Sequence, residues 1–137
     1  EIRRTEVQCF MGLGFELGMR CFNSRAAGAA FVDRHRLAPR ILHEDGQGRE
    51  EILIGPEDTP CFGVARLIVQ GKVPDRDRGR CYNLIVAAGR GRLTGPDCEL
   101  PLQPGTTLFI PAASQHEAYH AAPGEALTLI KCFPPPS

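Results

Sequence analysis

Short apolar runs separated by turn residues occupy most of the chain after residue 30. Pairs such as Asp45-Gly46, Gly55-Pro56 and Pro104-Gly105 stand between the runs and favour reversals of the chain. Many short strands joined by such turns are typical of an all-β sandwich or barrel. The strands that this pattern predicts span residues 38–42, 51–54, 62–70, 81–88, 90–94, 99–102, 107–110, 118–120 and 126–133.

A different pattern covers the segment from Thr5 to Asn23, where apolar residues recur at spacings of three and four, as on one face of a helix. Glycines inside this segment weaken the pattern, because glycine is a poor helix former. We expect residues 1–28 to form a short N-terminal helical segment that packs on a β-barrel made of residues 29–137. The apolar residues of the helical pattern are Val7, Phe10, Met11, Phe15, Met19 and Phe22.

Length and charge exclude several classes of function. The chain has 137 residues, enough for one domain with a sizeable core. Its 16 basic and 16 acidic side chains give a formal net charge of zero, which argues against nucleic acid as a partner, because such binding relies on a basic face. No window approaches the roughly 20 apolar residues of a membrane span, and no secretory signal stands at the N-terminus. We therefore expect neither nucleic acid nor a membrane as a partner.

Six cysteines stand mostly within apolar runs, and no two have the CxxC spacing of a zinc site or a redox motif. A chain of this length does not need disulfides to build a core. We interpret the cysteines as buried free thiols with a structural role, and we expect the protein to reside in the reducing cytoplasm. They are Cys9, Cys21, Cys61, Cys81, Cys98 and Cys132.

Residues 84–112 combine a strand, a glycine turn, a short hairpin and a second strand that ends in Ile110-Pro111-Ala112. Gly89 and Gly91 permit a tight reversal, and Pro111 closes the strand where no hydrogen-bond donor is needed. This pattern resembles that of the cupins. The resemblance implies a cupin-type jelly roll, also called a double-stranded β-helix, in which two sheets face each other.

A narrower resemblance joins segments from both ends of the chain. They look like the C-terminal cupin half of bacterial class I mannose-6-phosphate isomerases. Members of that family are zinc enzymes that interconvert mannose 6-phosphate and fructose 6-phosphate by proton transfer. Their zinc ligands belong to the N-terminal half, whereas the C-terminal half packs against it and typically lacks the metal. The segments that carry the resemblance are residues 14–22, 60–64, 105–112 and 131–135.

The resemblance implies a supporting role for this chain. The sequence begins with Glu1 and not with methionine, so we expect it to be a piece of a longer aldose–ketose isomerase. Its partner is then the N-terminal catalytic half of the same protein, which holds the zinc ion. We expect this chain to contain no cofactor of its own and to be inactive when isolated.

A metal-binding cupin needs His-x-His and a glutamate on an early strand, followed by a later histidine. His116 fits the spacing of the late motif, but residues 76–83 contain neither histidine nor glutamate. A catalytic zinc ion takes three protein ligands, so we predict no metal site, with His116 and His120 as the best single candidates. The alternative is a small metal-dependent cupin enzyme in which both histidines join a carboxylate such as Glu117 or Asp97.

A group of arginines in the same region could bind a sugar phosphate by paired contacts. The alternative is a solvated loop in which Asp75 and Asp77 balance the charge. We select Arg80, Tyr82 and His116 as candidate substrate-binding residues, and no catalytic residue. A stand-alone cupin module that binds a small sugar or metabolite in the barrel mouth is a further alternative, and a dimer through edge strands stays open. The arginines are Arg76, Arg78, Arg80, Arg90 and Arg92.

Overall fold

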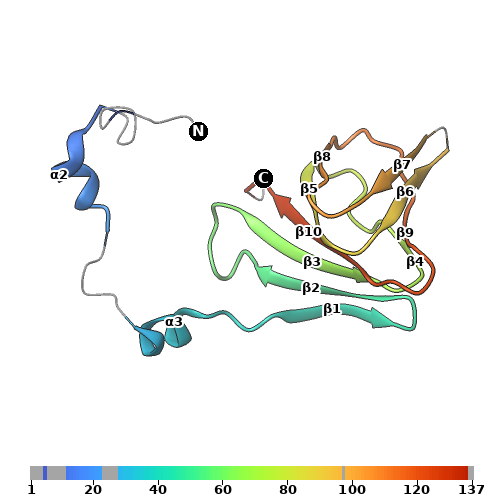
Figure 1. The fold of residues 1–137 in the computed structure, drawn as a ribbon, viewed down its shortest axis with the longest axis horizontal. Coiled ribbons are helices and arrows are strands. Elements are labelled where there is room, and N and C mark those ends of the chain that lie inside the picture. The colour runs from blue at the N-terminus through green and yellow to red at the C-terminus, as the bar shows by residue number, and fades with distance from the viewer. Residues whose placement is uncertain (1–4, 6–11, 23–27, 97, 136–137) are drawn as a thin grey trace. The chain divides into compact units, whose positions relative to one another are not determined.

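The computed structural model describes residues 5, 12–22, 28–96 and 98–135, and it divides the chain into two units, Glu1–Arg36 and Leu37–Ser137 (Figure 1). The described part of the first unit contains two short helices, α2 (Gly14–Met19) and α3 (Ala29–His35). The strands belong to the second unit. We describe each unit by itself, and the site discussed below lies entirely in the second.

The described strands of the second unit form two antiparallel sheets. One sheet has the order β1-β2-β3-β10-β5-β8, and the other has the order β4-β9-β6-β7. This arrangement confirms the predicted all-β jelly roll. The strands are β1 (Arg40–Asp45), β2 (Gly48–Ile54), β3 (Gly63–Val69), β4 (Lys72–Pro74), β5 (Tyr82–Ala88), β6 (Gly91–Gly95), β7 (Cys98–Leu102), β8 (Thr107–Ile110), β9 (Ala118–Ala121) and β10 (Leu127–Phe133).

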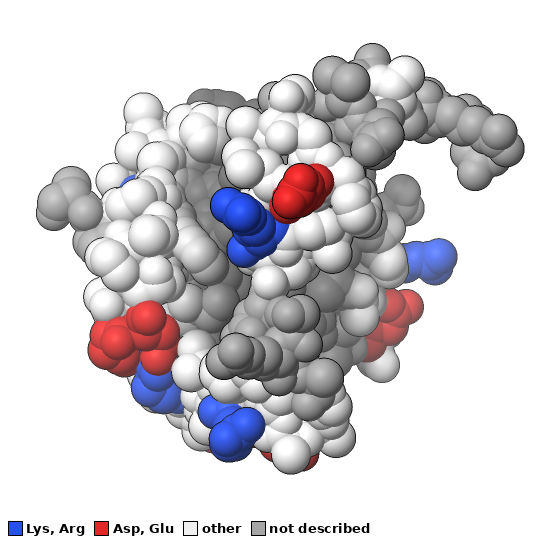
Figure 2. Space-filling view, turned by 90° about the vertical axis from the view of Figure 1, so that its left-hand side faces the viewer, with Lys and Arg blue, Asp and Glu red and all other residues white. Residues whose placement is uncertain are grey.

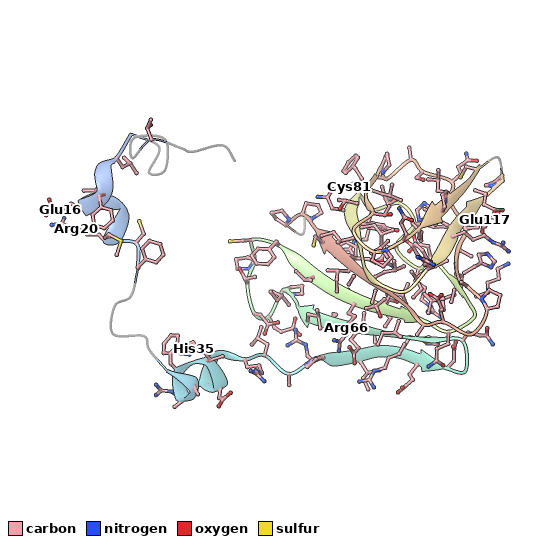
Figure 3. The ribbon with its side chains drawn as sticks, viewed as in Figure 1. Glu16, Arg20, His35, Arg66, Cys81 and Glu117 are labelled. Carbon is pink, nitrogen blue, oxygen red and sulfur yellow. The ribbon has the colours of Figure 1, made fainter. Side chains whose placement is uncertain are left out.

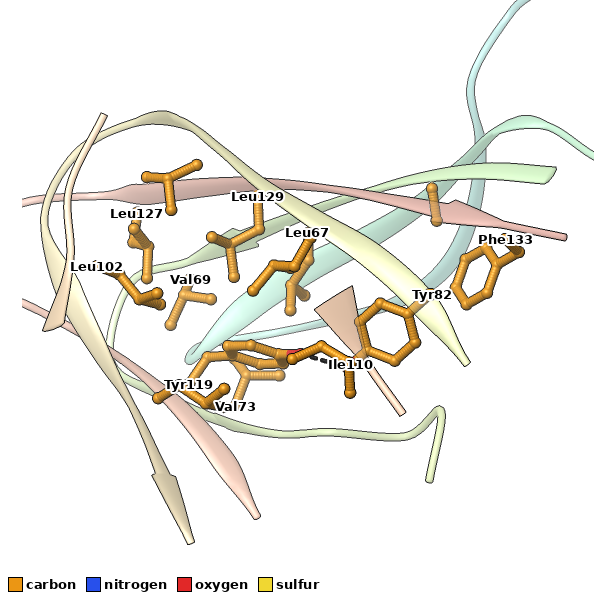
Figure 4. Close-up of a cluster of buried hydrophobic side chains, with 14 residues drawn as sticks. Leu67, Val69, Val73, Tyr82, Leu102, Ile110, Tyr119, Leu127, Leu129 and Phe133 are labelled. Atoms are coloured by element: carbon orange, nitrogen blue, oxygen red, sulfur yellow. Dashed lines mark hydrogen bonds between the residues drawn. The ribbon is translucent and has the colours of Figure 1, made fainter. Parts of the chain in front are cut away.

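The hydrophobic core lies between the two sheets. In β10, every second residue from Leu127 to Phe133 is buried and the three residues between them are half exposed, because side chains alternate across a strand. Figure 4 draws the apolar side chains among the buried ones in one cluster with Leu102 and Tyr119, which come from the other sheet. Each fully buried aliphatic side chain stabilises the folded state by about 1.5–3 kcal/mol.

All nine predicted strands are present, with ends that differ from the prediction by a few residues. Each one carries its own alternation of apolar and polar residues, so a local pattern is enough to reveal it. The sequence does not predict β4, because this strand is only three residues long and ends in Pro74. Proline is rare inside sheets.

The predicted helix over residues 5–23 is present in part, as α2. Gly12 and Gly14 have φ angles of 80° and 78°, which the interior of a right-handed helix excludes, so α2 begins at Gly14 and does not extend back through Gly12. Residues 6–11 and 23 lie outside the described residues. Helix α3 was not predicted from the sequence, although its first residues, Ala29 and Ala30, are strong helix formers.

The boundary of the barrel also differs from the expected one. The predicted barrel begins at residue 29, whereas the second unit of the structure begins at Leu37, after α3. The packing of the N-terminal segment on the barrel stays a prediction.

The prediction that the cysteines are buried is wrong for the five that the structure describes. Cys21, Cys61 and Cys98 are exposed, and Cys81 and Cys132 are half exposed. All five are free thiols. Cys132 shows the reason, since it stands between two inward-facing residues of β10 and therefore points outward. Cys9 lies outside the described residues.

Charged side chains are scattered over the described surface. On the face in Figure 2, Lys and Arg lie interspersed with Asp and Glu, as a net charge of zero allows. Of the described helices, none has the length and apolar character that crossing a membrane requires. The cytoplasmic location stays a prediction.

Gly89 marks the point where the chain leaves the first sheet after β5 and enters the second at β6. Its φ angle is 76°, and a Cβ atom added there would lie 2.0 Å from the backbone oxygen of Ala126. Glycine is therefore needed at this position both for its backbone conformation and for the close approach of the segment that enters β10. The tight reversal between neighbouring strands that the sequence predicts is not present, because β5 and β6 do not pair and belong to different sheets. Gly89 instead serves the crossing between the sheets.

We expect Gly89→Ala to lower the free energy of unfolding more than Gly105→Ala does. Gly105 also has a positive φ angle, 87°, but a Cβ atom added there would meet nothing within 4 Å, so that variant carries the backbone strain alone, about 1–2 kcal/mol. Gly89→Ala adds overpacking against the backbone, which costs about another 1–3 kcal/mol. Urea unfolding of both variants measures the difference, and equal losses would contradict this account.

Candidate functional site

A lysine lies in the middle of the apolar core. Lys131 of β10 stands on the same face as Leu129 and Phe133, and its side chain is 1% exposed. An ammonium group that loses its water without gaining partners destabilises the folded state by several kcal/mol. The surroundings of Lys131 must therefore supply compensating charge.

Three carboxylates surround the Lys131 ammonium. Its Nζ atom donates to Asp75 Oδ1 at 2.9 Å, to Asp77 Oδ2 at 2.7 Å and to Glu50 Oε1 at 3.3 Å. Glu50 is in place because of strand register. It pairs with Leu67 of β3, and Ala65, two residues away on the same strand, pairs with Lys131, so Glu50 and Lys131 share the inner face.

The two aspartates come from the charged run that follows β4. The backbone N–H of Asp75 donates to the carbonyl of Glu117 at 2.9 Å, which extends the pairing of β4 with β9 by one residue. Asp75 is 5% exposed and Asp77 is half buried, whereas Arg76 and Arg78 face solvent. The interpretation of this run as a solvated loop balanced by its aspartates is therefore wrong, because both aspartates turn inward to Lys131.

The second oxygen of Asp75 continues the network. His116 Nε2 lies 2.6 Å from Asp75 Oδ2, and the Tyr82 hydroxyl donates to the same oxygen at 3.0 Å. The Tyr119 hydroxyl then donates to Tyr82 at 2.6 Å, a contact drawn in Figure 4. On its other side, His116 Nδ1 lies 2.9 Å from the hydroxyl of Ser114.

Together these residues form what we call the buried ionic cluster. Its members come from both sheets and from two loops, and they satisfy one another's hydrogen bonds. The aromatic rings of Tyr82 and Tyr119 each lie 5.4 Å from the ammonium nitrogen, close enough for a cation–π contribution. The cluster comprises Glu50, Asp75, Asp77, Tyr82, His116, Tyr119 and Lys131.

Electrostatics keep the central ion pair charged. Burial acts to raise the pKa of Asp75, but the charge of Lys131 and the hydrogen bonds with Lys131 and His116 outweigh it and hold that pKa below its ordinary value of 3.8. Burial acts to lower the pKa of Lys131, yet the carboxylates of Asp75, Glu50 and Asp77 raise it. Burial is also the main reason why the pKa values of Tyr82 and Tyr119 are raised. Both hydroxyls therefore stay protonated and act as hydrogen-bond donors.

A zinc ion does not fit this cluster as it stands. The three carboxylate oxygens that would bind a metal each accept a hydrogen bond from Lys131, and a cation there would meet the positive charge of the ammonium. Among the residues that the structure describes, no group of three or more His, Cys, Asp and Glu side chains is arranged to hold a metal ion.

The structure does not bring the two candidate metal-binding histidines together. His116 is 3% exposed and belongs to the cluster, whereas His120 is half buried and contacts the Thr94 hydroxyl at 3.1 Å. The two histidines have different partners here, and the alternative of a site built on both stays a prediction. Glu117 is exposed (Figure 3), and Asp97 lies outside the described residues.

A cavity of about 200 Å³ lies beside the cluster, where β2 ends, β3 begins and β10 ends, and we call this place the barrel mouth. Apolar side chains line most of it, including Ile52, Val64 and Phe133. Glu50 and Asp77 reach both this cavity and the Lys131 ammonium, so they connect the cluster to the mouth of the barrel.

The three candidate substrate-binding residues occupy different surroundings. Tyr82 and His116 lie inside the cluster, 1% and 3% exposed, so their burial argues against contact with a substrate. Arg80 lines the cavity, where it donates to Asp77 at 3.2 Å and lies 4.4 Å above the ring of Phe133. Their roles in substrate binding stay predictions.

The predicted group of arginines does not form one patch. Arg80 lines the cavity at the barrel mouth, whereas Arg90 and Arg92 line a separate hollow together with His120. Another arginine, Arg66 of β3 (Figure 3), pairs with the buried carboxylate of Glu51. Arg80 and the pair Arg90 and Arg92 therefore line different hollows, and the binding of a sugar phosphate to these arginines stays a prediction.

Sequence reasoning missed Lys131 and all three of its carboxylate partners. Two signals were available, and the first is that Lys131 interrupts an otherwise apolar alternation between Leu129 and Phe133. Asp75 and Asp77 are two residues apart, a spacing that places both side chains on one side of an extended segment. Nothing in the sequence pattern connects these two signals, because they lie more than fifty residues apart.

Comparisons with known proteins support the fold. No family model and no curated protein matches the chain. The solved mannose 6-phosphate isomerase from Bacillus subtilis is similar with a TM-score of 0.62 and 16% identity, over 88% of this chain and 34% of that one. The polyketide cyclase RemF from Streptomyces resistomycificus is similar with a TM-score of 0.60 and 22% identity, over 73% of this chain and 76% of that one.

A cupin-2 domain from Rhodospirillum rubrum is similar with a TM-score of 0.56 and 15% identity, over 71% of this chain and 68% of that one. Identities this low bear on the fold alone. The solved neighbours and the two facing antiparallel sheets together establish that residues 37–137 adopt the cupin-type jelly roll.

We expect Asp75→Asn to lower the free energy of unfolding by about 3 kcal/mol at pH 7, because it removes a charge that compensates the buried ammonium of Lys131. The matched control is Glu57→Gln, which removes a carboxylate that pairs with Arg40 at 3.0 Å on the exposed surface. That variant should cost less than about 1 kcal/mol. Urea unfolding compares the two, and a loss for Asp75→Asn no larger than the control would count against a compensating role.

The same variant has a predictable pH dependence. The pKa of Asp75 is lower in the folded state than its ordinary value of 3.8, so the carboxylate stabilises the fold above that pH. Its contribution is lost as the pH falls through the folded-state pKa. The difference between wild type and Asp75→Asn should therefore be largest near neutral pH and shrink on acidification below about pH 4.

Proposed function

We propose that this chain is the C-terminal, non-catalytic cupin domain of a mannose-6-phosphate isomerase-like enzyme. In this proposal the whole protein interconverts mannose 6-phosphate and fructose 6-phosphate. The zinc ion and the groups that transfer the proton belong to an N-terminal half of the same protein. The jelly roll described here supports that half and carries no reaction of its own.

The observation that carries this proposal is the filled interior of the barrel. The buried ionic cluster occupies the space between the sheets, and its side chains satisfy one another. Tyr82, His116 and Lys131 are each at most 3% exposed, so a sugar phosphate has no access to their polar atoms. The charged side chains that line the neighbouring cavity are Glu50, Asp77 and Arg80, and each already pairs within that group or with Lys131.

The extent of the similarity to the isomerase adds support. The barrel unit, residues 37–137, makes up about 74% of the chain. The similarity to the Bacillus subtilis enzyme covers 88% of the whole chain. The match therefore includes residues that precede the barrel. The polyketide cyclase and the cupin-2 domain match over 73% and 71%, which is no more than the barrel alone.

Exposed apolar side chains provide a surface that a neighbouring domain could cover. Ile41 and Leu42 of the edge strand β1 are 52% and 58% exposed, and Phe62 beside the barrel mouth is 45% exposed. Covering such residues stabilises a complex by about 25 cal/mol per Å² of apolar surface removed from water. Packing against the N-terminal half would use this surface.

The activity of this chain alone provides the first test. We expect the 137-residue chain, incubated with Zn²⁺ and mannose 6-phosphate, to form no fructose 6-phosphate above the buffer control. The isomerase from Bacillus subtilis serves as the positive control in the same assay. Zinc-dependent turnover by the isolated chain would show that the domain is catalytic and would overturn that part of the proposal.

A longer polypeptide that contains this chain provides the second test. We expect it to interconvert the two sugar phosphates, and to lose most of that activity when the barrel, residues 37–137, is removed. An intact polypeptide with its full zinc content but without turnover would contradict the isomerase assignment.

A further inference from the structure

We propose that the ammonium group of Lys131 is the resident cation of the barrel interior. In this role it holds the three surrounding carboxylates in place and excludes metal ions. Without it, the same side chains form a site for a divalent cation or for a small alkylammonium ion. The inference rests on the buried ionic cluster and does not depend on the isomerase assignment.

The arrangement around Lys131 is that of a cation site. A lysine ammonium has three N–H donors and no acceptor. Each of the carboxylates of Glu50, Asp75 and Asp77 accepts from it, at distances between 2.7 and 3.3 Å. The acceptors come from β2 and from the loop after β4, whereas the cation comes from β10, so segments far apart in the sequence converge on one positive charge.

Formal charge favours a divalent ion once the ammonium is gone. Asp77 also pairs with Arg80 at 3.2 Å, so three carboxylates face two cationic groups and the formal balance is one negative charge. A divalent ion in place of the ammonium brings this balance to zero. Three carboxylates and the nearby imidazole of His116 are ligands that Mn²⁺, Co²⁺ and Zn²⁺ accept.

The geometry also explains why the wild-type chain excludes such an ion. The carboxylate oxygens lie 2.7–3.3 Å from the nitrogen, whereas metal–oxygen bonds are about 2.0–2.2 Å long. A metal ion needs these oxygens to move inward by up to about 1 Å, into the space that the ammonium fills. The ammonium is covalently tethered, so its effective concentration at the site is high and a free ion competes poorly.

A purely structural lysine leads to different expectations. If Lys131 mattered through the volume of its side chain, an apolar replacement such as Lys131→Met would preserve stability, as replacements of buried ion pairs by apolar residues sometimes do. If its charge matters, Lys131→Met leaves three carboxylates without a cation. The variant then unfolds at a lower temperature and gains stability from added cations.

The first experiment restores the missing atoms in Lys131→Ala. This substitution removes three carbons and the nitrogen, which n-propylammonium replaces, and 1-propanol is the matched neutral control. We expect saturating n-propylammonium to raise the Tm of the variant by at least about 4 °C above any effect of 1-propanol or of the same salt on wild type. Equal effects of the two compounds, or none from either, would overturn the proposal.

The second experiment measures Co²⁺ binding by calorimetry and by visible absorption of the bound ion. We expect no stoichiometric binding by wild type, one ion per chain for Lys131→Ala, and at least tenfold weaker binding when Asp77→Asn is added to that variant. Binding by wild type that Asp77→Asn weakens would show that the ammonium does not exclude metals. Failure of Lys131→Ala to bind would show that the side chains do not form a cation site.

Loss of folding in Lys131→Ala does not remove the test. In that case the circular dichroism of the strands is measured with and without Co²⁺ or n-propylammonium. Recovery of the strand signal with either cation, but not with 1-propanol, supports the proposal. The proposal is overturned if Lys131→Met has the same Tm as the wild type and if added cations do not change that Tm.

Discussion

The buried charge of Lys131 is the constraint on which the architecture of this domain depends. An ammonium group in an apolar core is tolerated when its partners are charged, close and held in place. Here those partners come from β2 and from the loop after β4, and β10 brings the lysine to them. The packing of the apolar side chains and the position of the loop are therefore coupled. A change in either would expose the Lys131 ammonium to water or separate it from its carboxylate partners.

Asp75 links the two sheets through this constraint. Its backbone extends the ladder of the four-stranded sheet, while its side chain binds Lys131 of the six-stranded sheet. Tyr82 and Tyr119 repeat the connection, since one belongs to each sheet and their hydroxyls meet. Apolar packing between sheets tolerates small sliding movements, whereas directional hydrogen bonds between charged groups fix the register of one sheet on the other.

The sequence predicts the strands well and the cluster poorly, for one physical reason. The alternation of apolar and polar residues along a short segment predicts a strand, as in β10, where the inward positions are Leu, Leu, Lys and Phe. An ion pair joins residues that are distant along the chain, such as Glu50 and Lys131, which are 81 positions apart. The loop of alternating Asp and Arg is typical of a solvated surface until the fold shows that its aspartates point inward.

The jelly roll alone says little about function, because solved proteins with this fold include a polyketide cyclase and a mannose 6-phosphate isomerase. What distinguishes one jelly roll from another is the chemistry of its interior. In this chain, the Lys131 ammonium compensates the buried carboxylates, and it also fills the space in which those carboxylates would contact a ligand. Glu50 and Asp77 are the exceptions, since each accepts a hydrogen bond from Lys131 and also lines the cavity. A molecule bound in this cavity would lie beside two of the three carboxylates that compensate Lys131, so its charge would act on the ion pairs on which the core depends.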